Sequence, residues 1–169
     1  ARYLINNSFY SKNELINYKE NEYGNTILHF VSYSDVYDAV ELLLNNGANP
    51  NGRNYNEETC LHWASRMGSL KTMSILINYG ININLQDSTG GTALHSAAAV
   101  GNPEAIPFLL NNGCDLTLLD ADGKTAYDIS KSYNGEGYSA VSFLLNKYLN
   151  DNRNNNRYIP QKENIPKRR

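Results

Sequence analysis

The stretch "TALHSAAAVGN", residues 92–102, decides the fold because its opening recurs along the chain. The same Thr-x-Leu-His pattern stands in "TILH", which ends at His29, and in "TCLH", which ends at His62, and these segments contain all three histidines. The spacing between them is 33 residues each time. A fourth threonine, Thr125, follows at the same interval without its histidine. Self-similarity at such a period is typical of a repeat protein.

Glycines keep the same register. Gly47, Gly80 and Gly113 each close a run rich in Leu and Ile, as in "LLLNNGA". The 33-residue period with a Thr-x-Leu-His core resembles the ankyrin repeat family. The resemblance implies an all-α repeat solenoid of helix-turn-helix units with short β-hairpin fingers, in four repeats at 21–53, 54–86, 87–119 and 120–152.

Each position in the unit has a physical role. The threonine can cap the start of a first helix, and the glycine after the second helix can adopt the left-handed conformation that ends it. We expect helix pairs at 27–34 and 37–45, at 60–67 and 70–79, and at 93–100 and 103–112. Asn102 and Pro103 should open the last helix, and Pro107 should distort it by removing one backbone bond. Asp128 stands where the other units have histidine, and the resemblance implies a terminal unit here, because many ankyrin arrays finish with a Thr-x-x-Asp unit that has no following neighbour to bond.

The three histidines are predicted to be structural. Neighbouring helices pack roughly 8–10 Å apart, whereas zinc needs nitrogen ligands at about 2.0–2.1 Å, so equivalent positions on successive repeats cannot share a metal. The "DGKT" stretch lacks the first glycine of a phosphate loop, because Leu118 occupies that place. We therefore expect no enzyme, no metal and no cofactor. Cys60 and Cys114 stand at different repeat positions, so we expect buried, unpaired thiols.

The two ends differ from the repeats. Residues 1–20 are predicted to form a degenerate N-terminal helical cap. The net charge is −2, but residues 150–169 contain six Lys or Arg against two acidic residues, so the rest of the chain is acidic at −6. After Tyr148 the composition predicts disorder. In the basic polar tail at 153–169, Arg157, Tyr158, Lys167, Arg168 and Arg169 are candidate anchors for RNA or an acidic surface, and we favour a separate chain over the solenoid itself.

The resemblance also implies where a partner would bind. Ankyrin proteins bind other proteins through the finger tips and the exposed face of the first helices. We carry the family's variable positions over to this sequence one by one, and we favour aromatic, Arg and Met side chains because they are enriched in interface cores. The candidate partner-binding residues are Glu22, Tyr23, Phe30, Tyr33, Tyr55, Trp63, Arg66, Met67, Thr89 and Val100.

One alternative concerns "NEETCLHWA", which is similar to the ankyrin repeats of histone-lysine methyltransferases that read methylated lysine. Trp63, Phe30 and Tyr33 would form an aromatic cage for a cation, although Asn25 and Tyr33 stand where that subfamily has Trp and Glu. Inter-repeat packing explains Trp63 and Phe30 equally well.

The sequence thus predicts a non-catalytic scaffold that holds an extended segment or loop of another protein in the groove of the first three repeats. The competing class is a ribonucleoprotein or chromatin subunit anchored by the basic tail. No signal peptide or membrane-spanning run is visible, so we expect an intracellular chain, cytoplasmic or nuclear, that is monomeric in isolation.

Overall fold

The chain forms a row of paired helices. The computed structural model describes residues 11–20 and 22–154. In this part of the chain the helices are α2 (Lys12–Ile16), α3 (Ile27–Tyr33), α4 (Tyr37–Asn45), α5 (Cys60–Met67), α6 (Leu70–Asn78), α7 (Ala93–Ala99), α8 (Ala105–Asn111), α9 (Ala126–Lys131) and α10 (Glu136–Asn154).

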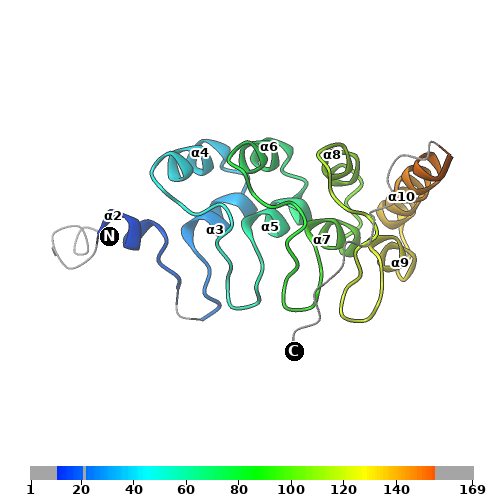
Figure 1. Cartoon of the computed structure of the whole chain (residues 1–169), viewed down its shortest axis with the longest axis horizontal. Helices are drawn as coiled ribbons and strands as arrows, with labels where there is room; N and C mark the ends of the chain where they lie inside the picture. Colours follow the sequence, from blue (N-terminus) through cyan, green and yellow to red (C-terminus); the bar gives the residue numbers. More distant parts are fainter. Residues whose placement is uncertain (1–10, 21, 155–169) are drawn as a thin grey trace, which may run out of the picture.

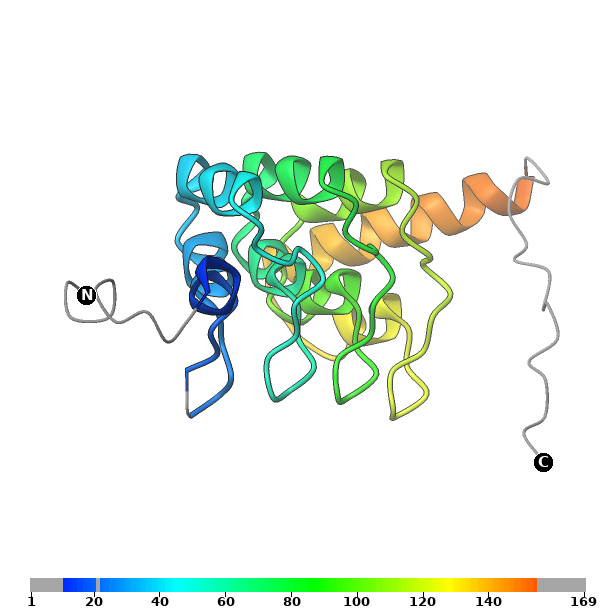
Figure 2. The same cartoon turned by 60° about the vertical axis from the view of Figure 1, so that its left-hand side comes forward.

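The pairs stack side by side in two layers. Figure 1 shows α3, α5, α7 and α9 as one row, with α4, α6 and α8 as a second row above it and long loops projecting below. The turned view in Figure 2 shows the projecting loops in a line. Each first helix contacts the first helix of the next pair. The predicted all-α repeat solenoid is therefore confirmed.

The projecting loops are not regular hairpins. Each is closed by a pair of backbone hydrogen bonds near its tip, as from Asp87 N–H to the carbonyl of Gly91 at 2.8 Å and from Gly90 N–H to the carbonyl of Asp87 at 2.9 Å. The described residues contain a single isolated β-bridge, between Arg53 and Thr59, and no strand. The expected β-hairpin fingers are therefore not confirmed. Loops project where the fingers were expected, but they form no strands among the described residues.

The repeated threonines start the first helices as predicted. Thr26, Thr59, Thr92 and Thr125 are the N-cap residues of α3, α5, α7 and α9, and each forms a capping box with the residue three positions later. Such a box satisfies backbone N–H groups that a helix start leaves unpaired. Glu57 departs from the pattern, since it takes φ +59° where the other repeats have Gly24, Gly90 and Gly123.

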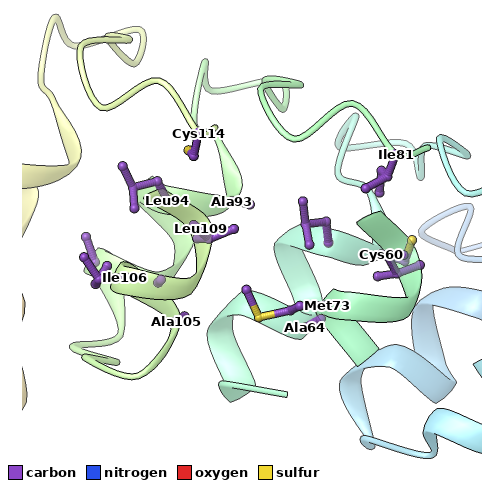
Figure 3. Close-up of a cluster of buried hydrophobic side chains, with 14 of the residues drawn as sticks. Cys60, Ala64, Met73, Ile81, Ala93, Leu94, Ala105, Ile106, Leu109 and Cys114 are labelled. Atoms are coloured by element: carbon purple, nitrogen blue, oxygen red, sulfur yellow. The ribbon is translucent and has the colours of Figure 1, made fainter. Parts of the chain in front are cut away.

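The core lies between the two layers and between successive repeats. Figure 3 shows part of it, in which Met73, Leu94, Ile106 and Leu109 are fully buried. The small residues Ala64, Ala97 and Ala98 are also fully buried. Because they add so little volume, first helices of adjacent repeats can approach closely.

The prediction for α8 was wrong at its start. The helix begins at Ala105, not at Pro103, and Pro107 therefore lies in its first turn. A start at Pro103 would have needed a bond from the N–H of residue 107 to the Pro103 carbonyl, and proline has no such N–H. In the first turn of a helix the backbone N–H groups have no partner within the helix, so the N–H that Pro107 lacks removes no hydrogen bond. The distortion expected at Pro107 therefore does not follow. The Asn102 side chain instead accepts the N–H of Glu104 at 3.1 Å.

The last helix, α10, runs into the segment for which the composition predicts disorder. α10 continues past Tyr148 to Asn154, so the prediction of disorder is wrong for residues 149–154. Val141 and Leu145 bury one face of α10, and the Tyr148 hydroxyl donates to Asn111 of α8 at 3.0 Å. Once these contacts hold a helix, each further residue adds one backbone bond at small cost. The candidate tail anchors Arg157, Tyr158, Lys167, Arg168 and Arg169 lie outside the described residues.

Two buried serines yield a stability prediction. The hydroxyls of Ser32 and Ser65 are buried without a hydrogen-bond partner, whereas repeat three has Ala98 at the equivalent position. Burying an unsatisfied polar group costs about 1–3 kcal/mol. Ser65→Ala should therefore raise the free energy of unfolding by about 1 kcal/mol in a urea titration, since alanine also has the higher helix propensity. A loss of stability would show that the hydroxyl has a partner after all.

Candidate protein-binding surface

The histidines hold successive repeats together. The backbone N–H of Thr26 donates to His29 Nδ1 at 3.2 Å, so this nitrogen must have its lone pair free and the ring proton must lie on Nε2. His29 Nε2 then donates to the carbonyl of Glu58, in the next repeat, at 3.1 Å. His62 and His95 repeat both contacts, reaching the carbonyls of Gly91 at 3.1 Å and Lys124 at 3.2 Å.

Both ring nitrogens are thus engaged in structural bonds. Burial lowers the pKa of all three histidines, and the bond to the carbonyl of the next repeat offsets this only in part. In residues 11–20 and 22–154, no three His, Cys, Asp or Glu side chains lie together so that they could hold a metal ion. Burial also raises the pKa of Cys60 and of Cys114 to about 12, so neither thiol is activated as a nucleophile.

Asp128 takes over one of the two roles in the last repeat. Its Oδ2 accepts the Thr125 N–H at 3.0 Å and the Thr125 hydroxyl at 2.6 Å. It caps the start of α9 as the histidines cap theirs, without a donor for a further repeat.

An aromatic cluster lies across the first two repeats. Phe30 and Tyr33 of α3 meet Trp63 of α5 edge-on, with ring centroids 5.9 and 5.7 Å apart. His29 meets the same indole from below the surface at 5.8 Å. Phe30 and Tyr33 are each 48% exposed, whereas Trp63 is half-buried. Trp63 is therefore the base of the cluster, and Phe30 and Tyr33 form its outer surface.

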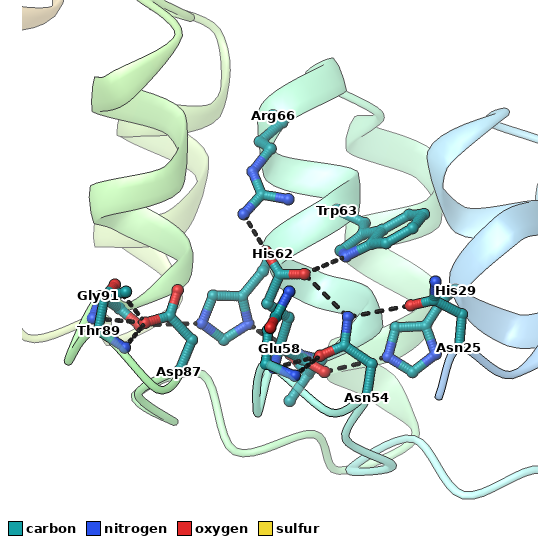
Figure 4. Close-up of polar contacts among 12 residues, drawn as sticks. Asn25, His29, Asn54, Glu58, His62, Trp63, Arg66, Asp87, Thr89 and Gly91 are labelled. Atoms are coloured by element: carbon teal, nitrogen blue, oxygen red, sulfur yellow. Dashed lines mark hydrogen bonds and ion pairs between the residues drawn. The ribbon is translucent and has the colours of Figure 1, made fainter. Parts of the chain in front are cut away.

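Glu58 anchors this base. Its carboxylate accepts the Trp63 indole N–H at 3.1 Å and the Asn54 amide at 2.9 Å, and it forms an ion pair with Arg66 (Figure 4). Burial opposes its ionisation, but the bonds from Arg66 and Asn54, the Arg66 charge and the indole N–H outweigh burial, and the pKa of Glu58 lies below its ordinary value. Asn54 in turn donates to Asn25 at 2.9 Å. The rings are therefore held on a satisfied polar network.

This geometry favours packing over a cation cage. Phe30 and Tyr33 each pack edge-on against Trp63, and Arg66 already compensates the nearby Glu58 charge. Asn25 is buried and bonded to Asn54, so it forms no wall.

The remaining predicted residues fall into two groups. Glu22, Tyr23, Tyr55 and Thr89 are exposed on the projecting loops. These loops are joined at their tips, because Tyr55 N–H donates to the Tyr23 carbonyl and Ala121 N–H to that of Thr89, both at 2.8 Å. Arg66, Met67 and Val100 lie at the far ends of α5 and α7, where Arg66 and Val100 line a shared open hollow of about 380 Å³.

Sequence reasoning missed Glu58 and Asn54. Glu58 precedes its capping threonine where the other repeats have Asn25, Gly91 and Lys124, and this break in the pattern was its only signal. Asn54 had a clearer signal in the sequence, since Asp87 and Asp120 follow it at intervals of 33 residues. All three side chains accept N–H groups from the same two positions of the loop.

Family comparisons agree with this architecture. A family model for ankyrin repeats in three copies matches residues 1–87, and one for ankyrin repeats in many copies matches residues 76–130. The chain belongs to the ankyrin repeat family. A search of the curated proteins found no match. Ankyrin repeats are in general protein–protein interaction modules and typically non-catalytic scaffolds. No helix in the described residues is long and apolar enough to cross a membrane.

The histidines predict a pH dependence of stability. The unfolded chain binds a proton on each histidine near pH 6.5, whereas the folded chain resists protonation because its histidine pKa values are lowered. Stability is therefore complete above about pH 6.5 and falls as the pH drops, by up to roughly 1.4 kcal/mol per pH unit for each histidine.

Urea titrations at pH 7.5, 6.5 and 5.5 measure this slope. The pH range in which the histidines affect stability is separate from that of Glu58 and Asp128. The lowered pKa values of these two carboxyl groups affect stability only below about pH 4.5. His62→Gln should reduce the slope by about a third, since one of three titrating groups is removed. Stability that stays flat or rises between pH 7.5 and 5.5 would contradict the assignment.

Proposed function

We propose that the chain is a non-catalytic scaffold that binds an extended segment or loop of a partner protein across its first three repeats. The observation that supports this most is the exposed aromatic cluster on a fixed polar base. Aromatic side chains are enriched among residues that contribute most to binding energy. Because Glu58 and Arg66 hold Trp63 in place before any partner arrives, little side-chain freedom remains to be lost on binding.

The contact surface of the proposal follows the repeats. Phe30, Tyr33 and Trp63 supply its apolar centre, and Met67 and Val100 continue it at the helix ends. Tyr23 and Tyr55 border it on the loops, together with Glu22 and Thr89. Arg66 has its charge paired with Glu58, so its part in the proposal is to position Trp63 and to border the hollow beside Val100.

The basic tail motivates the second candidate, a subunit anchored on RNA or on an acidic surface. Residues 155–169 contain five Lys or Arg and one acidic residue. Each phosphate contact made by Lys or Arg steepens the salt dependence of binding. A binding constant that falls by orders of magnitude between 50 and 200 mM salt would favour this candidate over the scaffold, whose proposed centre is apolar.

The scaffold proposal predicts a selective loss of binding in the double variant Tyr33→Ala, Met67→Ala. Partner purified by affinity capture on the unaltered chain should bind this variant at least about tenfold more weakly in calorimetric titration, because two exposed contact residues are lost. Thermal unfolding should hardly change, since surface substitutions are usually worth within ±0.5 kcal/mol. Trp63 and Arg66 are left intact because changing either would expose or unpair Glu58.

The matched control is Leu42→Ala, Phe143→Ala. Both side chains are well exposed but belong to the second helices α4 and α10. The control should bind within about twofold of the unaltered chain. Equal losses in both double variants, or none in either, would show that the aromatic face is not the binding surface.

A further inference from the structure

Asparagine followed by glycine is the most reactive backbone sequence in this chain. Such pairs occur four times, as Asn46–Gly47, Asn51–Gly52, Asn112–Gly113 and Asn134–Gly135. At each pair the backbone nitrogen of the glycine can attack the side-chain carbonyl carbon of the asparagine, because glycine has no side chain to obstruct the approach. The attack requires a glycine N–H that is not held in a hydrogen bond and an asparagine side chain that is free to rotate. The fold therefore decides which of the four pairs can react.

Two of the pairs are held at the ends of second helices. Asn46 is the C-cap residue of α4, and its side-chain amide donates to the Leu42 carbonyl at 2.7 Å. The N–H of Gly47 donates to the Leu44 carbonyl at 3.1 Å. The pair at residues 112–113 repeats both contacts at the end of α8, at 2.8 and 3.2 Å. In both pairs the attacking nitrogen and the side chain are engaged.

The third pair is held between two repeats. Asn51 accepts the backbone N–H of Asn82 through Oδ1 at 2.8 Å. The N–H of Gly52 donates to the Asn49 carbonyl at 3.0 Å. Here too, both reacting groups have to leave hydrogen bonds before they can meet.

The fourth pair has neither restraint. Asn134 and Gly135 are exposed in the link between α9 and α10, at one end of the stack (Figure 1). Within residues 11–20 and 22–154, neither the Asn134 side chain nor the Gly135 N–H makes a hydrogen bond. Gly135 has φ +140°, a conformation that side chains other than hydrogen rarely allow. The link thus leaves both reacting groups free.

We propose that Asn134 is a site of spontaneous deamidation and that the other three pairs are protected by the fold. The Gly135 nitrogen forms a bond to Cγ of Asn134, and the bond from Cγ to the side-chain nitrogen breaks. The proton lost by the Gly135 nitrogen ends on the departing nitrogen, which leaves as ammonia. One water molecule then opens the cyclic imide at either carbonyl and gives aspartate or isoaspartate. No oxidant, reductant or enzyme is needed.

The product changes the link to the last helix. Either form adds a negative charge at position 134, two residues before Glu136, where α10 begins. In the isoaspartate form the backbone also runs through the former side chain and gains one methylene group. The link leads to Tyr138, which stacks on Tyr133 with ring centroids 5.1 Å apart and donates to the Ala99 carbonyl at 3.3 Å. The modification therefore acts on the contact between the last two repeats, away from the aromatic cluster.

The test is peptide mass spectrometry of the full chain after incubation at pH 7.5 for several weeks. Proteolytic peptides that carry asparagine, aspartate or isoaspartate are separated and quantified for each of the four pairs. Asn134 should convert at least about tenfold faster than the other three asparagines, because these react only after local opening. In concentrated urea all four pairs should convert at comparable rates, and the rate at Asn134 should stay within about threefold of its value in the folded chain.

The matched control is Asn134→Gln. The glutamine side chain is one methylene longer and closes the corresponding ring far more slowly, so conversion in the link should be lost. The rates at the other three pairs should not change.

Two results would overturn the proposal. Equal conversion of all four pairs in the folded chain would show that the hydrogen bonds at the other three give no protection. Conversion of Asn134 that is more than about tenfold slower in the folded chain than in urea would show that the link is held as well. Neither readout involves a partner, so the outcome is separate from that of the binding experiment.

Discussion

The bond from a histidine Nε2 to a carbonyl of the following repeat is the contact on which the stack depends. Each ring is fixed at Nδ1 by the start of its own helix and at Nε2 by the next projecting loop, so one side chain sets both the helix start and the repeat spacing. The bonds are buried, where an unmade hydrogen bond is costly. Losing one of these hydrogen bonds therefore weakens the interface between two repeats. The free energy of such interfaces is what holds a one-dimensional array of repeats together.

The proposed binding surface depends on the same contact. The carbonyl that accepts the His29 proton belongs to Glu58, and the side chain of Glu58 holds Trp63 and Arg66. The inter-repeat bond and the base of the aromatic cluster thus share one residue. Phe30 and Tyr33 stand on a surface whose lower layer is already ordered, and this is the property expected of a pre-organised interface.

Most of the fold could be predicted because the repeat register sets it. The threonines mark the starts of α3, α5, α7 and α9 to the residue. The errors arose where one local feature overrides the register. Pro107 delays α8 because it lacks an N–H, and contacts of Val141, Leu145 and Tyr148 extend α10 into a polar sequence.

The site could be predicted only in part. Exposed positions such as Tyr33 and Met67 follow from the repeat, since the family places them on the open face. The network of Glu58 does not follow from it, because it joins a loop residue to Trp63 and Arg66 on the next helix and to Asn54 across the loop. Which side chains meet in this way depends on loop geometry that a 33-residue period does not encode.

A long-range proton–nitrogen correlation spectrum of the imidazole rings tests the central claim most directly. Such spectra distinguish the two neutral tautomers from the charged ring. At pH 7.5 all three histidines should be neutral, with the proton on Nε2 and Nδ1 acting as acceptor. Rings protonated on Nδ1, or charged at this pH, would contradict the proposed link between repeats.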